Sequence, residues 1–301
     1  MKMIKALALS LGETNKPVIT KYQLGVVVFG LYRQKRYKGE PVSLQKDVAE
    51  AADFQKYLKQ LLEDGVLAPH RDLPNGVYSL LGNTKWSAEE AVCAIDPFAY
   101  TSHLSAMEYH GITDRVPSKL FMSSPDDKDW KLYAQDKMKR DLQENYEIYR
   151  QGNLPLLTRT KIKNIGKKEV KIFHSKHYGA YKKAHERDIR VATIGRTFLD
   201  MLRNPDLCGG INHVLETYDR YAETYLKLIT NEIDAHGGPI DKVRAGYIID
   251  ERLGIKDSIV ESWVQYAQRG SSRKLDPTAE FIAVWSDKWL LSLNVFEKNK
   301  S

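Results

Sequence analysis

The stretch SLQKDVAEAADFQKYLKQLLEDGVLAPHRDLPNGVYSL, residues 43–80, decides the N-terminal fold because it predicts two short helices followed by a small β-ribbon. In the second helix, apolar side chains recur at helical spacing and are expected to face a core. They are Phe54, Leu58, Leu61 and Leu62. Two short strands, 66–68 and 77–80, flank a loop rich in turn residues. This order predicts a winged helix-turn-helix, a fold that places its second helix in a DNA groove.

The opposite face of that second helix is polar and supplies the expected groove contacts. These are Gln55, Lys56, Lys59 and Gln60. Gln suits adenine and Lys suits guanine in the major groove. Arg71 lies on the loop between the two strands, the expected wing, where it is placed to hold a phosphate. Ser43 is expected to cap the first helix of the pair and is counted with the DNA-binding residues.

A supporting helix is expected over residues 20–38, just after Pro17. Its end carries four basic residues, which are Arg33, Lys35, Arg36 and Lys38. They are candidates for contacts with the DNA backbone. A basic cluster at a helix C-terminus is also favourable electrostatically without any ligand, so both explanations stand.

Length and composition suggest a multidomain intracellular protein. With 301 residues and 42% hydrophobic residues, the chain is expected to form two or three domains. The two cysteines, Cys93 and Cys208, indicate neither a disulfide framework nor a zinc cluster. The short apolar run near the start reads as a first helix, and no stretch approaches the ~20 apolar residues of a membrane span. We therefore expect a soluble, cytoplasmic protein with no membrane partner.

The net charge of +7 is unevenly distributed. Residues 1–86 carry +5 and residues 159–190 carry +8, so the remainder is acidic. Separate basic segments are what phosphate recognition requires, although solvated lysine faces are the simpler alternative for either one. The second basic patch consists of Arg159, Lys161, Lys163, Lys167, Lys168, Lys171, Lys182 and Lys183.

The composition turns polar over residues 83–87, which indicates a boundary between a domain at 1–85 and a second domain at 86–301. The second domain is expected to be mixed, with a helix over 102–110, a strand over 119–123 and a hairpin within 156–174. A subdivision near residue 190 would leave a helical part at 191–270, followed by a closing strand over 288–295. The expected class is a helix-rich α+β fold.

Two patterns are candidates for a catalytic or metal site. Glu169 and Lys171 have the spacing of a metal-dependent nuclease, which also needs an upstream aspartate from Asp126, Asp127 or Asp129. A hairpin with charged outward residues is the simpler interpretation. His103 and His110 share a helix face, but no further ligand is spaced to complete a metal site. We expect no enzyme activity, no metal and no cofactor.

Three later segments resemble the AbiEi family of antitoxin-repressors. They are YTSHLSAMEYHG at 100–111, VATIGRTFLDMLRNPDLCGGINHVLE at 191–216, and LDPTAEFIAVWSDKWLLSLNV at 275–295. The second segment holds the Arg-Thr-x-x-Asp helix and the Pro-x-x-x-Gly-Gly turn that are typical of the family. One departure is Gly195, where the family pattern leads us to expect an acidic residue before the arginine.

The resemblance implies an antitoxin in a toxin–antitoxin (abortive infection) system of phage defence. Such proteins repress their own operon by binding inverted repeats in its promoter. Their partner is a nucleotidyltransferase-like toxin, neutralised directly or indirectly. By the same implication, the chain is a monomer or weak dimer that binds operator DNA cooperatively. A protein-interaction scaffold without DNA binding is the remaining alternative.

Overall fold

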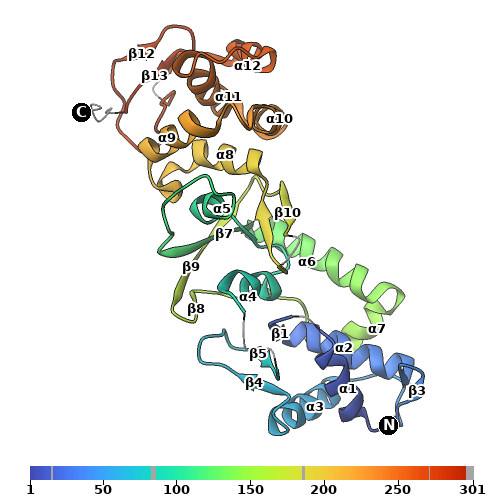
Figure 1. Cartoon of the computed structure of the whole chain (residues 1–301). Coiled ribbons are helices and arrows are strands. Elements are labelled where there is room, and N and C mark those ends of the chain that lie inside the picture. Colours follow the sequence, from blue (N-terminus) through green and yellow to red (C-terminus); the bar gives the residue numbers. More distant parts are fainter. Residues whose placement is uncertain (15, 83–85, 185–186, 271, 296–301) are drawn as a thin grey trace. The chain divides into compact units, whose positions relative to one another are not determined.

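The computed structural model describes residues 1–14, 16–82, 86–184, 187–270 and 272–295, and it has a mixed α and β structure (Figure 1). The chain forms two compact units. Unit 1 contains Met1–Ala99, Ser124–Lys176 and a short segment that ends at Ile189. Unit 2 contains Tyr100–Ser123, His177–Ala184 and the chain from Arg190 onward. The mixed structure agrees with the expected α+β class.

The N-terminal part of unit 1 combines helices with a small antiparallel sheet. Its elements are α1 (Met3–Gly12), β1 (Val18–Thr20), α2 (Lys21–Gln34), β2 (Arg36–Tyr37), β3 (Glu40–Pro41), α3 (Ala51–Glu63), β4 (Leu67–Pro69) and β5 (Val77–Leu80). The strand order is β1-β5-β4, and Tyr78 at the centre pairs with Ile19 and Pro69. A capping box between Thr20 and Gln23 starts α2. The expected helices near residues 20–38 and 54–62 and the two later strands are therefore present.

The helix expected to begin at Ser43 is absent, and that prediction was wrong. Residues 43–50 are irregular, and the main-chain N–H of Ser43 donates to the carbonyl oxygen of Met1 at 3.0 Å. Because the backbone of Ser43 pairs with the N-terminal segment, Ser43 caps no helix. Instead, α3 begins after Glu50, and the carboxylate of Asp53 accepts a hydrogen bond from the Glu50 N–H at 3.0 Å.

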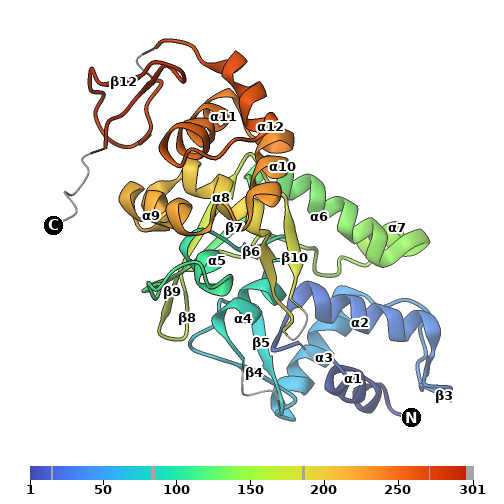
Figure 2. The same ribbon diagram turned by 45° about the horizontal axis from the view of Figure 1, so that its top comes forward.

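The later part of unit 1 packs on these N-terminal helices. Its elements are α4 (Ala88–Ile95), α6 (Asp127–Leu142), α7 (Tyr146–Gln151), β8 (Asn164–Ile165) and β9 (Lys168–Ser175). The Tyr22 hydroxyl on α2 donates to Asp141 on α6 at 2.8 Å. The Cβ of an alanine at Gly25 would lie 2.5 Å from the Tyr149 hydroxyl, so glycine allows α7 to approach α2 closely (Figure 2).

Unit 1 therefore joins segments from both sides of the expected domain boundary at residue 85. That boundary falls on residues 83–85, which lie outside the described part of the chain. The compact units are not the two consecutive domains, 1–85 and 86–301, that were expected, because contacts such as the Tyr22–Asp141 hydrogen bond join residues 119 positions apart.

Unit 2 contains a small sheet and a helical part. Its elements are β6 (Tyr100–Thr101), α5 (His103–Tyr109), most of β7 (Lys119–Pro125), β10 (Tyr181–Lys183), β11 (Arg190–Ala192), α8 (Ile194–Arg203), α9 (Ile211–Tyr221), α10 (Leu226–His236), α11 (Pro239–Gly246), α12 (Ser258–Ser262), β12 (Trp285–Ser286) and β13 (Leu291–Ser292). Strands β10 and β11 are antiparallel, β11 and β6 are parallel, and β6 and β7 are antiparallel.

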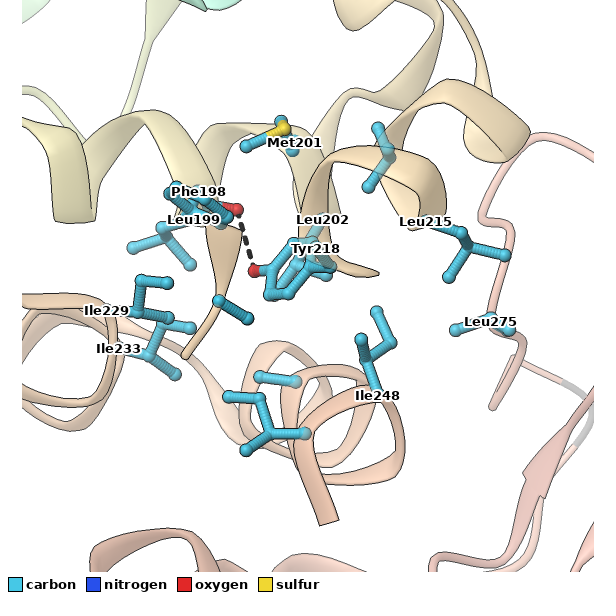
Figure 3. Close-up of a cluster of buried hydrophobic side chains, with 14 of the residues drawn as sticks. Phe198, Leu199, Met201, Leu202, Leu215, Tyr218, Ile229, Ile233, Ile248 and Leu275 are labelled. Atoms are coloured by element: carbon cyan, nitrogen blue, oxygen red, sulfur yellow. Dashed lines mark hydrogen bonds between the residues drawn. The ribbon is translucent and has the colours of Figure 1, made fainter. Parts of the chain in front are cut away.

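The core of unit 2 is formed by α8 to α11 (Figure 3). Phe198, Tyr218 and Ile233 are completely buried in it. The Tyr218 hydroxyl donates to the carbonyl oxygen of Phe198 at 3.1 Å, which satisfies its only polar group inside the core. Helices α8 to α12 fall within the helical part predicted at 191–270, which also holds a π-helical segment over Tyr247–Arg252. In the closing segment only Leu291–Ser292 is a strand, so the predicted strand over 288–295 was too long.

No described helix combines the length and the apolar character needed to cross a membrane.

Candidate nucleic-acid interface

Helix α3 has one buried face and one exposed polar face. Phe54, Tyr57, Leu58 and Leu61 are buried, each less than a tenth exposed. The four polar residues that the sequence placed on the other face do not all have the same exposure, since Gln55, Lys56 and Lys59 are exposed and Gln60 is half-buried. Three of the four predicted groove contacts are thus available to a partner.

The two lysine side chains of α3 make only weak contacts with neighbouring side chains. The Lys56 ammonium lies 5.4 Å from the centre of the Tyr57 ring, and Lys59 pairs with Glu63 at 3.6 Å. The Lys59 side chain is 78% exposed, and an exposed pair of this kind contributes about 0–1 kcal/mol. A phosphate or a base edge could therefore replace Glu63 at little energetic cost.

The loop between β4 and β5 carries one projecting cation. Arg71 has a 90% exposed side chain, and its nearest carboxylate, on Asp72, is 3.9 Å away. Leu73 is buried beneath the loop, and Gly76 has a φ of +81° that allows the turn into β5. The loop is therefore anchored while Arg71 extends into solvent.

Most side chains of the basic cluster at the end of α2 already bind partners within unit 1. Arg33 donates from Nε to the Asn145 side chain at 3.1 Å, Lys35 pairs with Asp47, and Lys38 pairs with Glu13. The Arg36 side chain is exposed and has no ion pair or hydrogen bond among the described residues. Of the four predicted backbone contacts, Arg36 is the one that needs no rearrangement to meet a phosphate.

Sequence reasoning overlooked Lys46, which lies just before α3. Its side chain is 54% exposed and pairs with Glu50 at 3.0 Å and with Asp53 at 3.5 Å. Lys46 falls inside the helix that was expected to begin at Ser43. For that reason the sequence did not indicate that Lys46 lies just before α3. Together, Lys46, Lys56 and Lys59 provide three exposed cations around this helix.

The second basic patch is divided between the two units. Lys161, Lys163, Lys167 and Lys171 are exposed on and beside the β8–β9 hairpin of unit 1, where Lys168 is half-buried. Lys182 and Lys183 are exposed on β10 of unit 2. The first strand expected within 156–165 is limited to β8, since residues 156–163 are not in a strand.

Arg159 does not belong to an exposed patch, because its charge is used inside unit 1. Its side chain is only 18% exposed and pairs with Asp127. The guanidinium also donates to the Ser124 hydroxyl at 3.2 Å and lies 5.3 Å from the centre of the Trp130 ring. The expectation that Arg159 contacts DNA is therefore corrected.

The residues proposed for a nuclease site lie far apart. Asp126 donates from its main-chain N–H to the carbonyl oxygen of Ser175, at the last residue of β9. Glu169 is near the other end of the same strand, about 20 Å away at the usual rise per residue. Asp127 pairs with Arg159, and the Asp126 side chain accepts from the Asp129 N–H at 2.9 Å. Glu169 and these aspartates could not share one metal ion.

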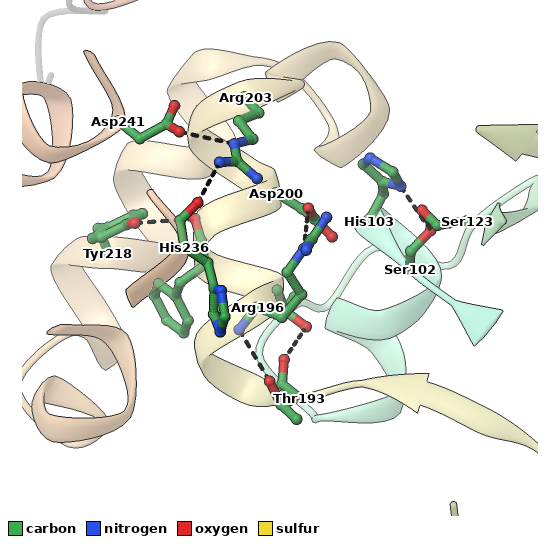
Figure 4. Close-up of polar contacts among 12 residues, drawn as sticks. Ser102, His103, Ser123, Thr193, Arg196, Asp200, Arg203, Tyr218, His236 and Asp241 are labelled. Carbon is green, nitrogen blue, oxygen red and sulfur yellow. Dashed lines mark hydrogen bonds and ion pairs between the residues drawn. The ribbon is translucent and has the colours of Figure 1, made fainter. Parts of the chain in front are cut away.

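The family-like motif residues form a buried polar cluster in unit 2 (Figure 4). Arg196 donates from Nε to Asp200 at 2.7 Å, and the two side chains are each 4% exposed. Burial opposes the charge of Arg196, but Asp200 and Tyr100 outweigh it and raise the pKa of the guanidinium. The second oxygen of Asp200 has no hydrogen-bond partner among the described residues.

The glycine that departs from the family-like pattern has a steric reason in this chain. A Cβ at Gly195 would lie 2.2 Å from the carbonyl oxygen of Leu228 and 2.9 Å from the Cβ of Glu232. Helix α10 therefore approaches α8 too closely for any side chain at residue 195. An acidic residue, as the resemblance led us to expect, would push these two helices apart.

The two histidines considered as metal ligands make separate contacts in unit 2. The Nδ1 atom of His103 lies 2.8 Å from the Ser102 hydroxyl, and Nε2 of His110 donates to the carbonyl oxygen of Ala192 at 2.8 Å. Burial lowers the pKa of both imidazoles. Both side chains are thus engaged in the packing of unit 2.

No protein-family model and no curated protein matches the sequence in comparisons with known proteins.

Proposed function

We propose that the chain is a sequence-specific DNA-binding repressor whose N-terminal residues form a winged helix-turn-helix. The observation that carries the proposal is that a two-faced helix is followed directly by a hairpin. Helix α3 has a buried apolar face and an exposed polar face, and the β4–β5 hairpin comes next in the chain. In a winged helix the second helix of the motif enters the major groove and the hairpin loop meets the backbone. Gln55, Lys56 and Lys59 would then face bases, and Arg71 would face a phosphate.

The order of the small sheet supports the same proposal. Strand β1 precedes α2 in the chain but pairs with β5 in the sheet. Along the chain, α2 and α3 therefore lie between β1 and the β4–β5 hairpin, and the sheet brings these two flanking segments together. This arrangement fixes the hairpin loop with respect to α3. A rigid relation between a reading helix and a backbone contact is what register on DNA requires.

The biological role in the proposal rests on the resemblance of the three sequence segments to antitoxin-repressors. On this basis the target is an operator with inverted repeats in the chain's own promoter. The partner is a nucleotidyltransferase-like toxin encoded in the same operon. The exposed lysines at 161–171 and on β10 would add electrostatic affinity without adding sequence choice.

A gel-shift titration of the full chain on the DNA upstream of its own gene tests the DNA-binding part. Lys56→Ala with Lys59→Ala should weaken specific binding by about 10-fold or more, because a good base contact contributes about 1–3 kcal/mol. The matched control is Lys128→Ala with Lys139→Ala, which removes two exposed lysines from α6 of the same unit. Equal weakening by both double variants would mean that only net charge matters.

The antitoxin part needs a separate experiment. The proposal predicts a neighbouring nucleotidyltransferase-like reading frame, and this gene is to be expressed from an inducible promoter, with and without the chain. The proposal expects growth arrest that the chain relieves. An absence of relief would remove the antitoxin role and leave the DNA-binding result standing, whereas a complete absence of DNA binding would favour the scaffold alternative.

A further inference from the structure

A cavity of about 210 Å³ opens on unit 1 between α6 and residues 157–159. Its floor is apolar and consists of Trp130, Ala134, Met138 and Leu157. Each of these four residues is less than a tenth exposed, so the floor is held by packing on the unit 1 side. An aromatic ring and a thioether are adaptable walls for a flat apolar ligand.

The rim of this cavity contains an incompletely satisfied arginine. The Arg159 guanidinium uses its two terminal nitrogens for Asp127, Ser124 and the carbonyl oxygen of Pro125. Its Nε–H is buried and has no acceptor among the described residues. A buried donor without an acceptor costs about 1–3 kcal/mol, so the Arg159 guanidinium beside the cavity remains an electropositive group that favours an anion at the rim.

A second cation on the rim fixes the preferred charge of a ligand. Lys131 lines the cavity, is exposed, and forms no ion pair with a described residue. Asp127 is already paired with Arg159, so the rim has one positive charge in excess. A negatively charged group is therefore favoured over a neutral or positive one.

The volume of the cavity corresponds to about one ring. An apolar cavity of about 150 Å³ holds benzene, so about 210 Å³ accommodates a ring with one small substituent. We propose that this cavity binds a small aromatic carboxylate. The ring packs against Trp130 and Met138, and the carboxylate accepts from the Lys131 ammonium at the rim.

Calorimetric titration of the full chain, without DNA, with benzoate tests this site. For a ligand of this size the expected dissociation constant is on the order of 1 mM. Benzyl alcohol, which has the same ring without the charge, should bind about 10-fold more weakly or not at all. Because DNA is absent, the result does not depend on the proposed repressor function.

Two substitutions locate the binding. Lys131→Glu should weaken benzoate binding by about 10-fold, whereas Lys139→Glu, the same charge change elsewhere on α6, should leave it unchanged. Ala134→Met should fill the cavity and abolish binding, with circular dichroism as the check that the chain folds. The proposal is overturned if benzoate does not bind at about 10 mM, if benzyl alcohol binds equally well, or if Lys131→Glu has no effect.

Discussion

The Nε atom of Arg196 donates a hydrogen bond to Oδ1 of Asp200 at 2.7 Å, one helical turn away along α8, inside unit 2. Both side chains are 4% exposed, so the pair is fully removed from water. A buried ion pair stabilises only when both partners remain, because a single buried charge carries the full desolvation cost. This pair is therefore a sensitive point of the helical core.

Arg196→Met should destabilise unit 2 by about 3–5 kcal/mol, because Asp200 loses its only hydrogen-bonded counter-charge among the described residues. The double substitution Arg196→Met with Asp200→Leu removes both charges and should recover most of that loss. Urea unfolding monitored by circular dichroism measures both effects. If the double variant is less stable than the single one, the pair does more than balance two buried charges.

Gly195→Ala should cost about 1–3 kcal/mol, because the new Cβ would lie 2.2 Å from the carbonyl oxygen of Leu228. Gly270→Ala is a suitable control in the same unit, since its nearest contact would be 3.7 Å away and its φ is not positive. Thermal unfolding of the two variants should therefore separate them clearly. Equal melting temperatures would show that α10 can move away from α8 without cost.

Stability should fall on acidification because of the half-buried His110 and the buried His103. Burial lowers the pKa of His110 from its ordinary value of 6.5, so below that pH the unfolded chain binds more protons than the folded chain. This contribution is fully present above pH 6.5 and is lost as the pH falls toward the folded-state pKa. The slope is at most about 1.4 kcal/mol per pH unit for one such group.

His110→Gln tests this pH dependence, since the glutamine amide can still donate to the carbonyl oxygen of Ala192 but does not titrate. Its free energy of unfolding should vary less between pH 7.5 and 5.5 than that of the unmodified chain, which carries the same buried His103. Chemical unfolding at about these two pH values, on either side of the imidazole pKa, gives the comparison. Parallel pH profiles would assign the acid sensitivity to other groups.

Arg71→Ala should weaken DNA binding to all sequences by a similar factor and should not change folding, because its side chain is 90% exposed. The loss of one phosphate contact reduces the slope of log affinity against log salt by about 0.9. Titrations on operator and unrelated DNA at several salt concentrations measure both quantities. A loss confined to the operator would mean that Arg71 reads bases, and an unchanged affinity would remove the loop from the interface.

Periodicity was a sound guide wherever a helix has one buried face. Phe54, Leu58 and Leu61 on α3 are buried as their spacing predicts, although Leu62, predicted with them, is only half-buried. The helical part after residue 190 follows the same periodicity. The pattern failed at 43–50, because the pairing of Ser43 with Met1 is a long-range contact that local sequence does not encode. Strand β1 was not expected either, because it is a strand only through its long-range pairing with β5.

Charge was a less reliable guide than periodicity. Arg159 counted toward a basic patch in the sequence, yet in the structure its partner Asp127 is 32 residues away. Lys182 and Lys183 belong to a different unit from Lys161 and Lys163. A sum of charges along the chain contains no information about which of them are neutralised, or about which lie on one surface.

The main-chain N–H of Ala51, at the first residue of α3, donates to the carbonyl oxygen of Gly152 at 2.9 Å. A Cβ at Gly152 would lie 2.7 Å from the carbonyl oxygen of Ala49, so the two segments are in close contact. During synthesis the ribosome completes the whole of α3 long before it adds residue 152, and chains fold as they emerge. The nascent N-terminal part must therefore wait for Tyr149 and Gly152 before α2 and α3 reach their final packing. The surface that we propose to read DNA is thus completed only after residue 152 has been synthesised, although it is encoded first.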